Sequence, residues 1–184
     1  IEAIVKDSSL TSGVDFGFAY WSAGASGFNR WHGNHKTGQG YSTPCTIYNC
    51  LKVPIYKGGA AQIAKMIRTV NPGGGTHLDS AMRIASRYYK NTTYSPIDKN
   101  LDCQNSYVIL IGDGDWFSHT HTRGLKIVKD LYNNNKIKTF SVAFGTGISA
   151  NGYRYFQDVA KAGGTGKSIL SLIHISEPTR RPKI

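Results

Sequence analysis

The sequence predicts an α/β domain with a doubly wound, mostly parallel sheet, and three observations support this. Patterns typical of helices and of strands alternate along most of the chain, as they do when helices connect parallel strands. Residues 107–111 are continuously apolar, which is typical of a parallel strand buried on both faces. The length of 184 residues suits one domain and leaves little room for a second core.

The N-terminal part predicts the end of a helix followed by two strands. Residues 1–11 resemble the last turns of a helix, and Gly13 follows as a stop signal. Residues 14–21 form an aromatic-rich strand pattern, and residues 51–56 form a second, shorter one. Proline lacks a backbone donor, so Pro54 places the second strand at a sheet edge. We expect the two strands to form an antiparallel hairpin at that edge.

The remaining elements follow from apolar spacing and from breaker residues. In chain order they are a helix with Ala60, Ile63, Ile67 and Val70 on one face, a helix with the stripe Leu78, Ala81, Met82, Ala85 and Tyr89, the strand 107–111, a helix carrying Leu125, Val128, Leu131 and Tyr132, the strand 139–144, and a helix over 153–162. Thr76 and Asp79 match a capping-box pattern at the start of the second of these helices. Gly163 and Gly164 end the last one.

The charge balance is strongly basic, with 22 Lys and Arg against 11 Asp and Glu and a net charge of +11. Such a charge suits a nucleic-acid or anionic partner. The basic residues are scattered singly, however, which is typical of a solvated face. Nucleic-acid binding therefore rests on charge alone. No stretch approaches the ~18 consecutive apolar residues of a membrane span.

The three cysteines favour a short disulfide over a zinc site. Cys45 and Cys50 are four residues apart in a loop rich in Gly, Asn and Thr, and no second pair or suitable histidine completes a zinc pattern. A Cys45–Cys50 disulfide would indicate an oxidising compartment. Cys103 remains as a free thiol or pairs outside this chain.

The predicted order of elements places two polar residues at the same edge of the sheet. Asp113 ends the most apolar strand, and Thr76 follows a three-glycine turn. Ligands of doubly wound sheets bind outside the carboxyl ends of the strands. A carboxylate and a hydroxyl are hard oxygen ligands of the kind that Mg²⁺ prefers. Spacing alone favours plainer roles, with Thr76 as a helix cap and Asp113 as a turn residue. Asp115 is either a plain turn residue or a carboxylate that assists the metal.

The motifs PGGGTHLDSAM, VILIGDGDW and KTFSVAFG, in this order, resemble the von Willebrand factor A (vWA) domain over residues 1–168. The resemblance implies a Rossmann-like fold and a metal-ion-dependent adhesion site for Mg²⁺, or Ca²⁺ or Mn²⁺, with Thr76 and Asp113 as ligands. The family's Asp-x-Ser-x-Ser motif and the first strand before it are absent here, so the site is incomplete. We also expect the last strand to be missing. The first strand should lie centrally, between residues 14–21 and 106–112.

The long insert makes the chain most similar to the vWA domain of type IV pilus tip adhesins. The resemblance implies a protein-binding module that catalyses no reaction and whose metal takes an acidic group from a protein or cell-surface ligand. It also implies a pilus-associated, extracellular location, with the periplasm in transit. The loop 23–50 should emerge beside the metal site as a partner-contact loop or as a plain surface loop; its aromatic and basic residues are Phe28, Arg30, Trp31, His32, His35, Lys36 and Tyr41.

Two other interpretations of the function stay open. A vWA subunit of an intracellular ATP-driven machine, of the chelatase kind, would favour free thiols, and a nucleic-acid-binding domain would show steep salt dependence. His119 and His121 are expected at the surface, and His77 at a rim or in solvent. Residues 169–184 do not continue the domain pattern. They include SLIHISEPTR, which resembles translated sequencing-adaptor sequence, so we expect a non-native tail there.

Overall fold

The computed structural model describes residues 1–21, 34–37, 40–44, 50–70, 76–98, 100–101, 103–145 and 147–171, with the backbone alone at 34–37, 40–44 and 171. Its elements are α1 (Glu2–Lys6), α2 (Ser8–Thr11), β1 (Phe16–Ala19), β2 (Asn34–Thr37), β3 (Gly40–Pro44), β4 (Leu51–Tyr56), α3 (Gly59–Met66), the short 3₁₀ helix η1 (Ile67–Thr69), α4 (Leu78–Tyr89), β5 (Tyr107–Gly112), α5 (Ser118–Asn135), β6 (Lys138–Phe144), α6 (Ala150–Ala162) and β7 (Ile169–Ser171). The predicted α/β class is confirmed.

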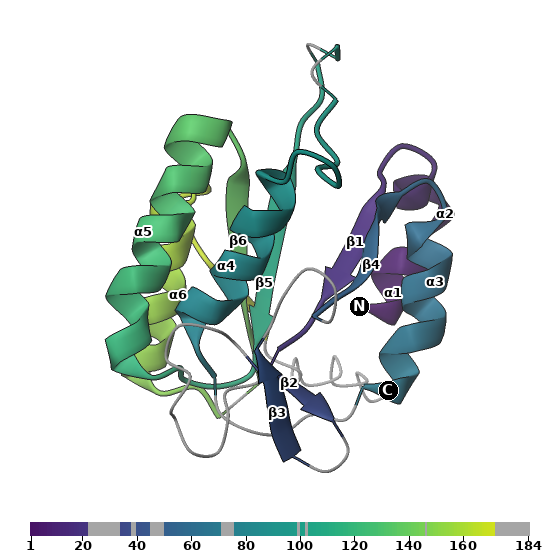
Figure 1. Cartoon of the computed structure of the whole chain (residues 1–184). Coiled ribbons are helices and arrows are strands. Elements are labelled where there is room, and N and C mark those ends of the chain that lie inside the picture. The colour runs from purple at the N-terminus through teal and green to yellow at the C-terminus, as the bar shows by residue number, and fades with distance from the viewer. Residues whose placement is uncertain are drawn as a thin grey trace, which may run out of the picture.

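The largest unit is a parallel sheet in the order β5-β6-β7. The helices α4, α5 and α6 lie along one side of it (Figure 1). Alternate residues of β6 are buried toward these helices, as the period of two in a strand requires. Leu110, Val128, Leu131 and Phe156 belong to the core between sheet and helices.

The opposite face of this sheet is largely open among the described residues. Ile109 is 55% exposed and Tyr107 is 47% exposed, although both lie on the most apolar strand. The prediction that residues 107–111 are buried on both faces is therefore wrong in this structure. The reason is the position of the helices: α4, α5 and α6 lie along one side of the sheet, so Leu110 is buried beneath them, whereas Tyr107 and Ile109 point to the opposite side.

The predicted hairpin partners β1 and β4 pair in antiparallel fashion, which confirms their pairing. They form a separate two-stranded sheet and not an edge of the parallel sheet, so the prediction of one continuous sheet is not met among the described residues. Pro54 is exposed on β4, where its missing donor costs no ladder bond. The helices α1 and α3 cover one face, and the small core beneath them contains Val5, Val53, Ala60 and Ile63. Gly59 is required here, because a Cβ at this position would lie 2.1 Å from the carbonyl oxygen of Phe16.

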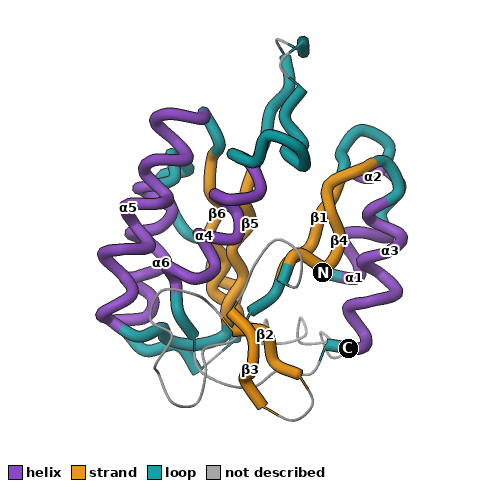
Figure 2. The backbone as a smooth tube through the Cα atoms, in the orientation of Figure 1, coloured by secondary structure: helices purple, strands orange, loops and turns teal. Residues whose placement is uncertain are grey.

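The helix α4 connects the two sheets. Its Tyr88 hydroxyl accepts a hydrogen bond from the Ile55 amide at 2.8 Å, while Leu78 and Met82 pack in the same core as Leu110 of β5. No described residues form a strand between β1 and β5, and the two sheets remain separate (Figure 2). One helix thus spans a place where a continuous sheet would need one more strand.

Several predicted boundaries need correction. Residues 169–171 form β7, parallel to β6, so the prediction that the last strand is missing is wrong, and this strand lies inside the predicted tail. The first helix is divided at Asp7, whose carboxylate accepts from the Ser9 amide and caps α2. The last helix begins at Ala150, three residues early, because Ser149 caps it through the Gly152 amide.

Candidate functional site

The two predicted metal ligands line one small cavity at the carboxyl end of β5. Thr76 and Asp113 border a space of about 20 Å³, together with Trp21 and Trp116. This volume is large enough for about one water molecule. Trp21 follows β1, so β1 ends at the same edge of the molecule as β5, as expected for parallel strands. The sequence-based expectation that Thr76 and Asp113 share an edge agrees with this arrangement.

Hydrogen bonds hold the two loops of the site together. The Phe117 amide donates to the Thr76 carbonyl oxygen at 3.1 Å. The Thr120 hydroxyl accepts from the Leu78 amide at 3.1 Å and donates to the Phe117 carbonyl at 2.8 Å. Thr76 is therefore fixed to the loop that follows Asp113 by contacts between α4 and α5.

The capping-box prediction for Thr76 is wrong. The N-cap of α4 is His77, no side chain caps this helix, and the first amide of α4 is satisfied by Thr120 from α5. Asp79, the expected second member of the box, instead accepts from Arg123 Nε at 2.8 Å. The Thr76 hydroxyl is thus not used as a helix cap.

Asp113 is exposed and its carboxylate makes no hydrogen bond or ion pair with another described residue. It follows Gly112, where a Cβ would come within 3.0 Å of the Phe156 ring. Glycine at this position lets the core pack directly below the site. The carboxylate therefore remains available to a cation or a donor at the cavity mouth.

Asp115 has a structural partner. Its carboxylate accepts from the Ser149 amide at 3.1 Å and from the Ser149 hydroxyl, at the start of α6. A Cβ on Gly152 would lie 1.7 Å from Asp115 Oδ1, so the glycine makes room for this carboxylate. In this arrangement Asp115 ties the loop after β5 to α6 and leaves Asp113 as the free acid of that loop.

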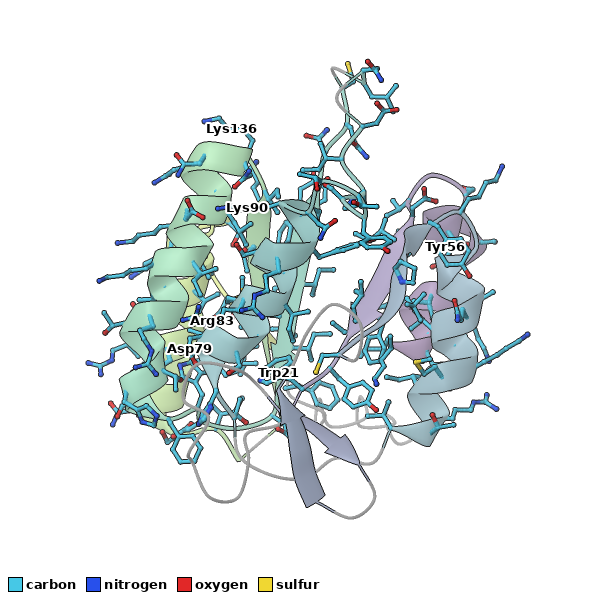
Figure 3. All side chains as sticks on the ribbon, in the orientation of Figure 1. Trp21, Tyr56, Asp79, Arg83, Lys90 and Lys136 are labelled. Atoms are coloured by element: carbon cyan, nitrogen blue, oxygen red, sulfur yellow. The ribbon has the colours of Figure 1, made fainter. Side chains whose placement is uncertain are left out.

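A buried polar group lies beside the site at the first turn of α4. His77 is 3% exposed, so the expectation of a rim or solvent position is wrong. Burial lowers the pKa of His77, against the attraction of Asp79. Asp79 is fully buried between the first turns of α4 and α5 (Figure 3). Neither His77 Nδ1 nor Asp79 Oδ1 has a hydrogen-bond partner among the described residues.

His121 is also more enclosed than expected, with 13% of its side chain exposed. Trp116 Nε1 lies 3.2 Å from His121 Nδ1, and Asp158 Oδ2 lies 3.1 Å from His121 Nε2. An indole nitrogen only donates, so Nδ1 must accept and the ring proton of the neutral form lies on Nε2. Tyr155 stacks on the same ring. The surface expectation is confirmed for His119 and wrong for His121.

The predicted partner-contact loop lies mostly outside the described residues, and so do Phe28, Arg30, Trp31 and His32. His35 and Lys36 lie on β2 and Tyr41 lies on β3, and these strands form an antiparallel hairpin with Lys36 opposite Tyr41. The hairpin is found beyond the carboxyl end of β5 (Figure 1).

The structure tests the cysteine prediction in part. Cys50 is disulfide-bonded and fully buried, whereas Cys103 is a free, exposed thiol. Cys45, the predicted partner, lies outside the described residues. The free state of Cys103 agrees with the expectation that it stays unpaired within this chain.

Thr76 and Asp113 carry oxygen ligands of the type that a hard cation prefers, but they supply only a few of the ligands that it needs. Thr76 and Asp113 offer one hydroxyl and one carboxylate at the cavity, whereas Mg²⁺ takes six oxygen ligands in octahedral geometry. No three His, Cys, Asp or Glu side chains gather as a metal-binding group within the described ranges. Further ligands would have to come from water, a partner or another segment.

Comparison with models of known protein families gives no match, and comparison with curated proteins gives none either. Within the described ranges, every helix is too short or too polar to cross a membrane.

Proposed function

We propose that this chain is the larger part of a metal-dependent protein-binding domain of the vWA kind. The observation that carries the proposal is the placement of Thr76 and Asp113 on one cavity at the carboxyl end of β5. Both offer hard oxygen atoms, and Asp113 has no other described partner. The domain binds an acidic group of a protein or cell-surface ligand and catalyses no reaction.

The Asp113 carboxylate and the Thr76 hydroxyl would hold Mg²⁺, or Ca²⁺ or Mn²⁺. When bound, the cation supplies a positive charge that accepts a carboxylate from the partner. Asp113 contributes most of the affinity, because it brings a full negative charge to a hard cation. Thr76 orients the site through its fixed position against the loop at Phe117. Asp115 holds that loop on α6 through Ser149.

The same proposal includes a further strand between β1 and β5. Both neighbouring strands lack a described ladder partner on that side, and α4 spans the place. A strand parallel to β5 there would end at the edge that carries Asp113. The vWA resemblance puts the Asp-x-Ser-x-Ser motif at the end of such a strand, where its oxygen atoms would complete the coordination.

The proposed cellular location and the proposed partner both rest on the segment 23–50. The hairpin β2–β3 lies at the same end of the molecule as the candidate site (Figure 1). We propose that the segment 23–50 selects the partner and that the protein acts at the cell surface in association with a type IV pilus. A disulfide at Cys50 suits an oxidising compartment.

The test uses the longest natural reading frame that contains residues 1–168. Asp113→Ala and Thr76→Ala should abolish Mg²⁺-dependent binding to the cell surface or pilus, with the larger loss for Asp113. Asp15→Ala serves as the matched control, because Asp15 is an exposed carboxylate that does not line the cavity. Deletion within 23–50 should change which partner is bound and leave the metal affinity nearly intact. Binding that persists unchanged in EDTA would contradict the proposal.

A further inference from the structure

A second and much larger cavity lies between α1–α2 and α3 and shares no lining residue with the candidate site. Its volume is about 740 Å³, within the range of small-molecule sites. Small side chains on α3 create it, because Ala60, Ala61 and Ala64 leave the space between the helices open. We call this space the α1–α3 groove.

One end of the groove is apolar and neutral. Val14 and Tyr56 line it near the start of α3, and they are 49% and 43% exposed. The Tyr56 hydroxyl donates to Gln62 Oε1 at 2.9 Å, so the ring is held beside the first turns of α3. Such exposed apolar area next to a cavity marks a surface that can bury an apolar ligand.

The other end of the groove is cationic. Arg68 follows α3, and its Nε lies 3.2 Å from both carboxylate oxygens of Glu2, while Lys6 pairs with the same carboxylate. Lys6, Lys65 and Arg68 line this end of the groove. Lys65 forms no ion pair among the described residues, and Glu2 pairs with Lys6 and Arg68. Three cations against one carboxylate leave an excess of positive charge. The Glu2 contact shows that this end accepts a carboxylate in the fork of Arg68.

The two ends are separated by the length of α3. From Ala60 to Arg68 the helical rise gives about 12 Å. A cationic end and an apolar end at this separation match a molecule that has an anionic head and a short unbranched tail.

We propose that the α1–α3 groove binds the anion of a medium-chain fatty acid. The carboxylate lies at Lys65 and Arg68, where it shares or replaces the Glu2 contact. The alkyl chain lies along Ala61 and Ala64 toward Val14. No covalent step is involved, and binding is independent of the metal at Asp113.

The experiment titrates the protein from the longest natural reading frame that contains residues 1–168 with sodium decanoate below its micelle concentration and follows backbone amide shifts by NMR. Saturable shifts are expected in α1 and α3. Ala61→Trp fills the groove and Lys65→Glu reverses a head-group charge. Each should weaken binding about tenfold or more, because the introduced indole ring would occupy the space of the alkyl chain and Lys65→Glu would repel the carboxylate. Lys126→Glu, on the exposed side of α5, is the matched control and should change the affinity less than about twofold.

Decanol tests the head group, since it has the same tail without the charge, and it should bind about tenfold more weakly than decanoate. Ala61 is exposed, so its substitution leaves the core intact. Three results would each overturn the proposal: shifts that do not saturate, equal affinity for decanol, or binding unaffected by Ala61→Trp. Addition of EDTA should change nothing, which separates this site from the one at Asp113.

Discussion

The two sheet regions of this chain differ in how completely their strands are covered. The β5–β7 region packs three helices on one face and buries a core that includes Phe156, Leu131 and Val128. The β1–β4 region rests on α1 and α3, and its core is centred on Val53 and Ile63. The sides of β1 and β5 that face each other carry no described ladder. The difference shows that a locally correct pattern produces each strand, whereas the coverage of a strand depends on its neighbours in space.

The largest expected effect concerns the strand that we propose between the two regions. We predict that the 184-residue chain expressed alone is poorly folded or aggregates, because β1 and β5 each have one edge without a ladder partner among the described residues and Ile109 is exposed. The protein from the longest natural reading frame that contains residues 1–168 should show one cooperative thermal transition. Calorimetry measures whether each of the two proteins unfolds in one cooperative transition, and the chemical-shift dispersion of their NMR spectra measures how well each is folded. A cooperative transition and well-dispersed spectrum for the chain alone would mean that the two regions need no further strand.

The next prediction compares the two cores in the protein from the longest natural reading frame that contains residues 1–168. Phe156→Ala should lower the free energy of unfolding by about 3–5 kcal/mol, since it empties the centre of the larger core. Val53→Ala should cost about 1–3 kcal/mol, because it removes fewer buried atoms from the smaller core. Urea unfolding gives both values. Equal costs would indicate that the two regions share one core.

The smallest expected effect concerns the surface of the β1–β4 region. Hydrogen bonds from Arg68 and Lys6 lower the pKa of Glu2 from 4.5 to about 2. Because the pKa is lower in the folded state, the stabilisation is complete above pH 4.5 and is lost as the pH falls through 2. NMR titration of the Glu2 side chain should show this value, and Arg68→Gln should return it toward 4.5. A Glu2 pKa near 4.5 in the unmodified chain would show that the ion pairs do not form in solution.

Much of the fold can be predicted from the sequence where a signal is local. The apolar run 107–111 gives β5, and the glycines at 163–164 end α6. The edge position of Asp113 follows from the rule that parallel strands present their carboxyl ends together. What could not be predicted depends on partners far along the chain.

Three residues near the site, Asp115, His121 and His77, show why their environments could not be predicted from the sequence. Asp115 meets Ser149, and His121 meets Asp158, at separations of 34 and 37 residues. No periodic pattern links such pairs, so the sequence offered only a turn and two surface histidines. His77 is buried because α5 packs over the first turn of α4, which is again a tertiary effect. The Thr76–Asp79 box failed for the same reason, since Thr120 and Arg123 of α5 take the contacts that a local cap would make.

The most direct test of a cation site at Thr76 and Asp113 is the position at which a paramagnetic metal binds. Mn²⁺ added in trace amounts to the longer natural protein should broaden the amide signals of Thr76 and residues 112–114 first. Mg²⁺ should restore these signals by competition, and Asp113→Ala should remove the effect. Broadening centred on His121 and Asp158, or spread evenly over the exposed carboxylates and unchanged by Asp113→Ala, would contradict a metal-dependent site at the carboxyl end of β5.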